Sequence, residues 1–355
     1  MNSNNLFIKF YKSKIFWPLI SLIVLLLFNF IMTPSFLKIS MKDGHLFGNT
    51  IDILNRAAPL IIISLGMTLV IATQGIDISV GSIIAISAAM SATVIVGGGS
   101  VPIAVIVGII CGIICGAWNG LLVSYIGVQP MVGTLILYIV GRGIAQLITG
   151  GQILTFTHKG FIFIGTGYIL LPVAIFITAI IGIIMYFLIR RTSLGLFIES
   201  IGVNSNSCKY AGIQSKKIVF LLYVICGLLA GVAGIILCSN IKSADANNVG
   251  LWLELDAILA TVIGGTSMSG GRFYLGGTVV GALFIQTLTT TIYSLGVPPE
   301  ITLVVKAIVV IVVCTIQTPQ FKKMINTKKV TISNNNVKEG EVAKAWIKKD
   351  WIPKK

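Results

Sequence analysis

The amino-acid sequence predicts an all-α integral membrane protein with about ten transmembrane helices. Hydrophobic residues make up 55% of the 355 positions and charged residues only 10%, whereas charged residues make up about a quarter of a typical soluble domain. The apolar runs continue for about 20 residues, the length that an α-helix needs to cross a bilayer. They do not alternate with polar residues in short segments, as the strands of a membrane barrel do.

Ten apolar runs justify the predicted helices in order along the chain. The first follows three lysines, and no small-residue cleavage site comes after it, so we expect a retained span and not a signal peptide. The runs are Ile15–Thr33, Ala57–Thr73, Ser79–Val96, Val101–Ile126, Met131–Ile148, Ile169–Ile189, Ile218–Cys238, Asp256–Ile263, Tyr274–Leu295 and Ile301–Gln317. We therefore divide the chain into an amino-terminal segment (1–14), a transmembrane domain (15–318) and a basic tail (319–355).

The net charge of +15 is distributed unevenly over the links between these runs. Ten spans put both termini on one side of the membrane, and that side receives nineteen of the 26 lysines and arginines, against five on the opposite side. Because positive residues concentrate in cytoplasmic links, both termini are predicted to be cytoplasmic. This placement, with the lysine-rich tail on anionic lipid, explains the basic balance better than nucleic-acid binding does.

Two segments, 74–82 and 264–273, interrupt apolar runs with polar residues and glycines. The first leaves no room for a soluble loop, and the second holds Gly264, Gly265, Gly270 and Gly271 around hydroxyl side chains. Irregular backbone at membrane depth survives only where protein or a water-filled cavity covers its polar groups. We therefore expect broken helices at both places. For the second segment, a plain cytoplasmic turn is the alternative.

Glycines four residues apart predict close helix packing in three runs, because small residues let two backbones approach each other in lipid. They are Gly108, Gly112, Gly116 and Gly120, then Gly227 and Gly231, then Gly277 and Gly281. Similar residues in 116–130 and 277–298 also indicate a weak internal repeat, a common feature of transporters.

Polar side chains between the second and third runs are candidates for a solute path. Asp77 can cap the helix that follows, through the amides of Ser79 and Val80. Alternatively, Asp77 and Gln74 can line a polar cavity and accept hydrogen bonds from a hydroxylated solute. The two roles can coexist. Asn119, in the fourth run, offers an amide that suits a neutral sugar.

A second group of candidates contains the charges that lie inside or beside apolar runs. Arg142 lies in the fifth run with Gln146 one turn later. Because a charge in the membrane is costly, such an arginine usually faces a cavity or an acidic partner. Glu254 and Asp256, at the start of the eighth run, are the acidic candidates together with Asp77.

Intramembrane catalysis has no support in the sequence. It lacks metal-ligand spacing, a nucleophile–base set and a cofactor motif, and both histidines fall in outward links. The glycines at 264–271 do not form a phosphate-binding loop, because the G-K-[ST] ending is missing. The chain is therefore predicted to have no metal, no cofactor and no ATP site of its own.

Three stretches carry a resemblance to a known family: GMTLVIATQGIDISVGSIIAIS (66–87), ESIGVNSNSCKYAGI (199–213) and LELDAILATVIGGTSMSGGR (253–272). They resemble the permease subunits of bacterial carbohydrate ABC importers, the ribose-permease family, over about residues 50 to 318. Within that family, residues 141–156, 244–258 and 296–310 are most similar to the galactofuranose importers.

The resemblance implies an ATP-driven importer of a monosaccharide, galactofuranose or a related sugar, in the bacterial inner membrane. It implies two ATP-binding cassette subunits, a second permease chain, identical or related, and a periplasmic or lipid-anchored sugar-binding protein. The link 190–217 would contact the ATPase through Glu199, Gly202, Asn204, Ala211 and Gly212. Two rival functions are an ion-coupled secondary transporter, with Asp77 or Asp256 as its coupling carboxylate, and a transferase acting on lipid-linked sugar.

Overall fold

The computed structural model describes residues 15–32, 36, 38, 40–42 and 44–317. The predicted segments 1–14 and 319–355 lie outside these residues. The described chain divides into two compact units, one up to Thr302 and one from Leu303 onward. Only α13 (Pro299–Gln317) continues into the second unit.

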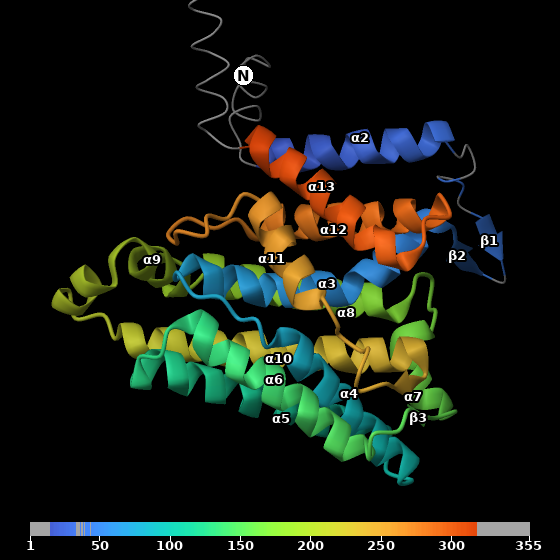
Figure 1. Cartoon of the computed structure of the whole chain (residues 1–355), viewed down its shortest axis with the longest axis horizontal. Helices are drawn as coiled ribbons and strands as arrows, with labels where there is room; N and C mark the ends of the chain where they lie inside the picture. The colour runs from blue at the N-terminus through green and yellow to red at the C-terminus, as the bar shows by residue number, and fades with distance from the viewer. Residues whose placement is uncertain (1–14, 33–35, 37, 39, 43, 318–355) are drawn as a thin grey trace, which may run out of the picture. The chain divides into compact units, whose positions relative to one another are not determined.

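The described part of the first unit is almost entirely helical (Figure 1). Its first half contains α2 (Phe16–Met32), β1 (Ser40–Lys42), β2 (His45–Phe47), α3 (Asn49–Ala72), α4 (Val80–Val96), α5 (Val101–Gly120), the π-helical η1 (Leu121–Ile126) and α6 (Pro130–Thr149). Its second half contains β3 (Leu154–Thr155), α7 (Lys159–Thr166), α8 (Val173–Arg190), α9 (Leu194–Tyr210), α10 (Ser215–Ile241), β4 (Ser243–Ala244), α11 (Leu253–Ile263) and α12 (Leu275–Ser294). The strands β1 and β2 form an antiparallel hairpin, and β3 pairs with β4.

All ten predicted apolar runs form helices, so the all-α multi-pass membrane fold is confirmed. Six of the described helices are long and apolar enough to cross a membrane: α3, α5 with η1, α6, α8, α10 and α12. Shorter apolar helices cover Phe16–Met32, Val80–Val96 and Ile301–Val313. The remaining predicted run, the eighth, corresponds to α11. This helix has 11 residues, which extend over about 16 Å at 1.5 Å per residue. It therefore cannot span the hydrocarbon core alone.

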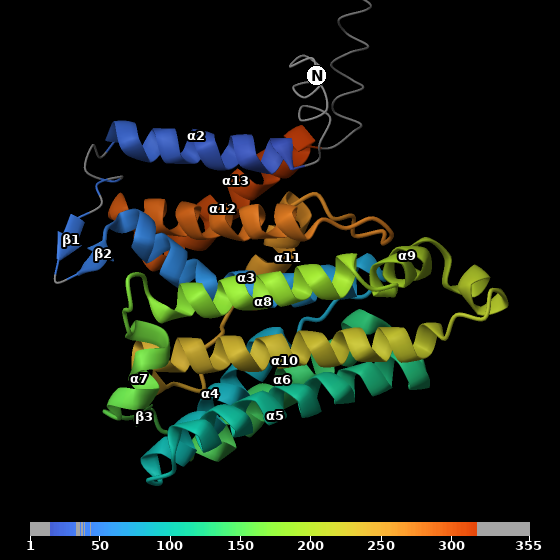
Figure 2. The same cartoon turned by 180° about the vertical axis from the view of Figure 1, so that it is seen from behind.

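The core is organised around α10, which packs against α5, α3 and α4. Figures 1 and 2 show α3 and α8 on one side of α10 and α5 on the other. The predicted glycine stripe of α5 faces the glycines of α10: a Cβ added to Gly227 would lie 2.7 Å from the Cα of Gly116. Larger residues here would separate the two backbones, so the predicted packing role is confirmed.

Both predicted interruptions are present. Helix α3 ends at Ala72 and α4 begins at Val80, with Gln74 between them at a φ of 65°. The segment between α11 and α12 is non-helical, and Gly265, Gly270 and Gly271 have positive φ.

A third interruption was not predicted. The loop 242–252 between α10 and α11 turns into the bundle, with Ala246, Val249 and Gly250 buried. The polar sequence of this loop does not indicate that it is buried. The shortness of α11 does indicate it, because another part of the backbone must fill the membrane depth that α11 does not cover.

Candidate functional site

The link 73–79 and the loop 242–252 enter the bundle from its two ends and meet beside the first turn of α4. A Cβ added to Gly250 would lie 2.6 Å from the carbonyl oxygen of Gly81, and a Cβ added to Gly81 would collide with the carboxylate of Glu254. Glu254 is itself only 2% exposed. The loop 242–252 is therefore in backbone contact with the first turn of α4, directly after the link 73–79, with a buried carboxylate at the contact.

Arg142 holds the loop from the side of α6. Its Nη1 donates hydrogen bonds to the carbonyl oxygens of Ala246, at 3.0 Å, and Val249, at 2.7 Å. One turn along α6, Gln146 Nε2 donates to Asn247 Oδ1 at 2.5 Å. The sequence predicted a cavity or an acidic partner for Arg142. Its hydrogen-bond acceptors are backbone carbonyls, which carry partial negative charge, and the acidic side chain of Glu254 is close enough to interact with it electrostatically.

Two atoms at this contact are buried without a hydrogen-bond partner among the described residues: Arg142 Nη2 and Glu254 Oε2. One is a donor and the other an acceptor, and the two side chains are close enough to interact electrostatically. A sugar hydroxyl can accept from one group and donate to the other. Asp256, the other predicted acid of this region, lies half-buried in the first turn of α11, where a helix N-terminus stabilises negative charge.

Hydrogen bonds within the loop 242–252 also stabilise its conformation. Asp245 Oδ1 accepts a hydrogen bond from the amide of Asn247 at 2.9 Å, and its Oδ2 accepts from the Asn248 side chain at 2.6 Å. Chiefly because of the bond from the Asn248 side chain, the pKa of Asp245 is lowered from 3.8. The ionised carboxylate therefore stabilises the turn that presents Ala246 to Arg142.

Asp77, Ser79 and Asn119 form a fully buried cluster. Asp77 Oδ1 accepts from the Ser79 amide at 3.0 Å, from the Ser79 hydroxyl at 2.6 Å and from Asn119 Nδ2 at 3.3 Å. The sequence suggested Asp77 as a cap through the amides of Ser79 and Val80. Asp77 bonds the Ser79 amide two residues on, whereas Ser79 is the N-cap residue of α4 and makes no capping hydrogen bond with its side chain. Asp77 Oδ2 and Asn119 Oδ1 have no partner among the described residues. A role for this cluster in the solute path stays a prediction.

Gln74 lies at the other end of α6 from Gln146. It lines a cavity with Gln129 and Pro130, where α6 begins, and sixteen residues of α-helix separate that point from Gln146, about 24 Å. Gln74 is exposed, and its Nε2 donates to the carbonyl oxygen of Gly202 at 2.8 Å. The structure thus joins Gln74 to α9 and not to the other path candidates.

Helix α9 lies on the carbonyl end of α3 and on the glycine-rich turn 264–274. A Cβ added to Gly202 would collide with the carbonyl oxygen of Ala72 and the amide of Gly271. The Gly271 amide in turn donates to the Ala72 carbonyl at 2.9 Å. We call this three-way contact of Gly202, Ala72 and Gly271 the glycine junction. Gly202 therefore faces the bundle, whereas the family resemblance placed it among the ATPase contacts.

Helix α9 consists of two helical parts. Asn204 interrupts α9 with φ −159° and ψ 99°, and its Oδ1 accepts from the amides of Asn206 and Ser207, both at 3.0 Å. This is N-cap geometry. An outward groove of about 700 Å³ is lined by Glu199, Asn204, Ala211 and Arg272, among others. Gly212 follows α9, is exposed and has a φ of 79°.

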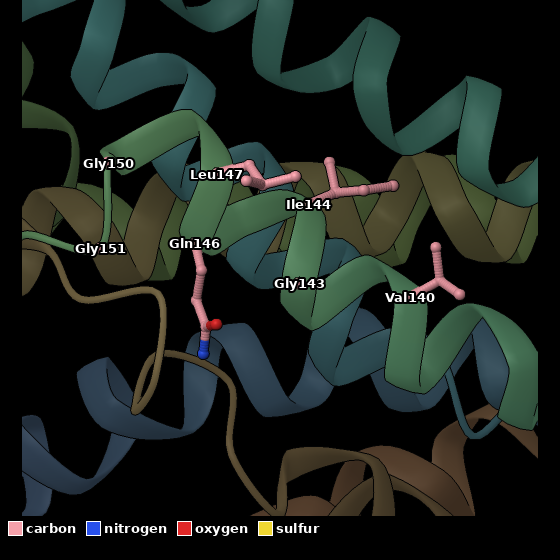
Figure 3. A pocket seen from close by; sticks show the side chains of 7 residues that line it. All are labelled: Val140, Gly143, Ile144, Gln146, Leu147, Gly150 and Gly151. Atoms are coloured by element: carbon pink, nitrogen blue, oxygen red, sulfur yellow. The ribbon is translucent and has the colours of Figure 1, made fainter.

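A second groove, of about 680 Å³, lies along the exposed side of α6 (Figure 3). Its lining mixes aliphatic and small residues with one amide: Val140, Gly143, Ile144, Gln146, Leu147, Gly150 and Gly151. Figure 3 shows the Gln146 side chain extending from α6 away from Ile144 and Leu147. Of the residues that line this groove, Gln146 was a candidate from the sequence.

The comparison with known families decides the class of protein. Residues 49–314 match the family described as branched-chain amino acid transport system / permease component. The chain belongs to this permease family. Membership assigns transport, and not ATP hydrolysis, to the chain, which confirms the resemblance found in the sequence.

Three curated relatives illustrate the family. The chain is 49% identical to the galactofuranose transporter permease protein YtfT of Escherichia coli K12, over 88% of this chain and 94% of the relative. It is 38% identical to the fructose import permease protein FruF of Bifidobacterium longum, over 90% and 92%. It is 39% identical to the ribose import permease protein RbsC of Bacillus subtilis, over 83% and 90%. No solved structure matches the chain.

Proposed function

We propose that the chain is the translocation subunit of an ATP-driven importer that carries galactofuranose or a related monosaccharide into a bacterial cell. The 49% identity to a galactofuranose permease over most of both chains supports the choice of sugar. Fructose and ribose permeases at 38% and 39% identity support monosaccharides as the wider class.

The charge distribution supports the orientation of the chain. The lysine- and arginine-rich links, α9 among them, lie on the cytoplasmic side together with both termini. The loop 242–252 then faces the outside. A sugar-binding protein delivers its ligand to that side, and two ATPase subunits contact the α9 side. A second permease chain, identical or related, completes the membrane domain.

The observation that carries the proposal is the meeting of two broken segments at Glu254 and Arg142. Transporters commonly place substrate sites near the membrane midplane where helices are discontinuous. Here the loop 242–252 acts as an outer gate, held by Arg142 and Gln146. When the gate moves, the guanidinium and carboxylate beneath it become available to sugar hydroxyl groups.

The α6 groove supports a path beside α6. Within the described residues, the bundle interior around Asp77 is closely packed, and Ser79 and Asn119 are 0% exposed. The groove on α6 is open, and its volume of about 680 Å³ lies within the usual range of small-molecule sites, about 300–1,000 Å³. A second permease chain facing this groove would enclose a path lined by Gln146 and reaching Arg142.

Coupling to the ATPase uses the outward face of α9. Glu199, Asn204 and Ala211 offer an exposed groove to a cassette subunit, and the glycine junction connects α9 to α3. Replacing Asn204 or Ala211 with cysteine should allow crosslinking to the cassette subunit. Lys242→Cys, at the opposite end of α10, is the matched control and should give no crosslink.

The proposal is tested by sugar uptake into proteoliposomes that contain the chain with its ATPase subunits and binding protein. We expect uptake of labelled galactofuranose that requires ATP and the binding protein, stops with vanadate and persists after ionophores collapse ion gradients. Uptake that follows an ion gradient without nucleotide would instead establish the secondary transporter. A changed sugar product would establish a transferase.

A further inference from the structure

A polar cavity of about 330 Å³ lies on the inner side of α9, separate from the groove proposed for the ATPase. It is bounded by the end of α3, by η1 and the start of α6, by α9 and by the start of α10. Gln74 and Ser205 contribute to its wall. Four segments of the chain therefore converge on one small space.

The charge of this cavity is positive. Lys209 of α9 and Lys216 of α10 are both in the lining. None of its fourteen described lining residues carries a carboxylate. Both lysine side chains are exposed at the cavity, and an anion bound there would interact favourably with both charges.

Two helix N-termini add to the positive potential. Helix α6 begins at Pro130 and α10 begins at Ser215, and both residues line the cavity. Neither N-terminus has a capping hydrogen bond from a side chain. The first turns of both helices therefore contribute the partial positive charge of a helix N-terminus, which favours anions.

A buried hydroxyl gives independent evidence for a ligand. Ser215 is only 5% exposed, and its Oγ is buried without a hydrogen-bond partner among the described residues. A buried hydroxyl normally finds a partner, because leaving it unpaired costs free energy. Ser215 belongs to the lining of the same cavity, so a bound acceptor would satisfy it.

We propose that this cavity binds a phosphate group, with Lys209, Lys216 and the Ser215 hydroxyl as its ligands. The inference goes beyond the proposed transport function and does not depend on it. The phosphate can belong to an anionic lipid headgroup or to a small phosphorylated solute. In either case it ties α9 to α10 and to the start of α6, beside the Gln74–Gly202 hydrogen bond.

The test uses the purified full-length chain and two probes. Isothermal titration calorimetry with inorganic phosphate measures binding of a free anion, and native mass spectrometry with phosphatidylglycerol or phosphatidylcholine measures retention of lipid. We expect at least one phosphate source to bind. Lys209→Gln with Lys216→Gln should weaken that binding about tenfold or more, because charge-assisted hydrogen bonds are lost.

Two further variants separate a site from general surface charge. Ser215→Ala removes the unpaired hydroxyl without changing charge and should weaken binding severalfold while leaving the thermal unfolding temperature unchanged. Lys217→Gln is the matched control, since Lys217 is exposed on the same turn of α10 but outside the lining, and it should bind like the wild type. Binding of phosphate alone or of phosphatidylglycerol alone identifies the source. The proposal is overturned if neither phosphate nor phosphatidylglycerol binds, or if Lys217→Gln weakens binding as much as the double lysine variant does.

Discussion

Helix α9 and the loop 242–252 lie at opposite ends of the bundle and are attached to it in different ways. At the α9 end, Gly202 lies directly on the backbone of Ala72 and Gly271. At the opposite end, the loop 242–252 is held by side chains, since Arg142 and Gln146 reach across to it from α6. The α9 contact is backbone on backbone. The loop has one close backbone contact, between Gly250 and Gly81, and is otherwise held by the side chains of α6.

This difference indicates different mechanical roles. A contact between backbones has no rotamer that can relax, so a displacement of α9 passes directly to α3 and to the turn 264–274. Long side chains can change rotamer and release their acceptors. In the proposed importer the α9 end transmits motion, and the loop end opens and closes.

The largest expected effect comes from placing a side chain in the glycine junction. Gly202→Ala puts a Cβ against Ala72 and Gly271, and overpacking of this kind costs about 1–3 kcal/mol. We expect sugar uptake to fall about tenfold or more while the ATPase subunits remain able to hydrolyse ATP. Uptake and hydrolysis are measured together in proteoliposomes.

Gly182→Ala in α8 is the matched control, because a Cβ at Gly182 meets no atom within 4 Å. If Gly202→Ala transports as well as Gly182→Ala, the glycine junction does not transmit motion.

The next effect concerns the outer gate. Arg142→Gln removes the two hydrogen bonds to Ala246 and Val249, and a hydrogen bond to a charged group contributes about 1.5–3 kcal/mol. We expect amide exchange in residues 245–250 to rise about tenfold or more, and sugar to leak without the binding protein. Hydrogen–deuterium exchange and efflux from loaded liposomes measure the two effects.

Lys159→Gln removes a charge from α7, at the same end of the bundle, without touching the loop hydrogen bonds. It should leave both exchange and leakage unchanged. Equal exchange in Arg142→Gln and Lys159→Gln would show that Arg142 does not hold the loop.

A smaller effect is expected at Gln74, which has a φ of 65° and a single hydrogen bond to Gly202. Gln74→Ala loses the bond and strains the backbone, whereas Gln74→Asn loses the bond but tolerates the positive φ. We expect both variants to reduce the sugar imported per ATP hydrolysed, with alanine the worse by severalfold. If both variants import as much sugar per ATP hydrolysed as the wild type, the glycine junction alone transmits the motion of α9.

The smallest effect is a pH dependence of the loop. The pKa of Asp245 is lowered by its hydrogen bonds, chiefly that from Asn248. The stabilisation is therefore present above the ordinary carboxyl pKa of 3.8 and is lost as the pH falls through the lowered value. Exchange of the 245–248 amides, corrected for intrinsic rates, should rise only in that acidic range, and Asp245→Asn should abolish the rise.

Local patterns in the sequence predicted the helices and their close packing. The four-residue spacing of Gly112 and Gly116 predicted a smooth face for close packing. These features depend on neighbours a few positions away, so the sequence alone is enough. The broken segments at 74–82 and 264–273 were also evident from their glycines and polar residues.

Contacts across long sequence separations could not be predicted in this way. Arg142 binds carbonyls more than 100 residues later, and any backbone carbonyl can be an acceptor, so residue types give no signal. The bond from Gln74 to Gly202 has the same character. The candidate residues were therefore recognised as polar groups inside apolar runs, but their division between two ends of the bundle required the structure.

The most direct test of the central claim locks the outer gate. Gln146→Cys with Asn247→Cys places two thiols where the side chains now touch, and a short thiol-specific crosslinker then fixes the loop to α6. We predict that the crosslinked importer retains its ATPase subunits but stops sugar uptake, and that cleavage of the linker restores uptake to the level before crosslinking. In each single-cysteine variant, treatment with the crosslinker should leave uptake at the level of the untreated variant. Full uptake with the crosslink intact would contradict the account.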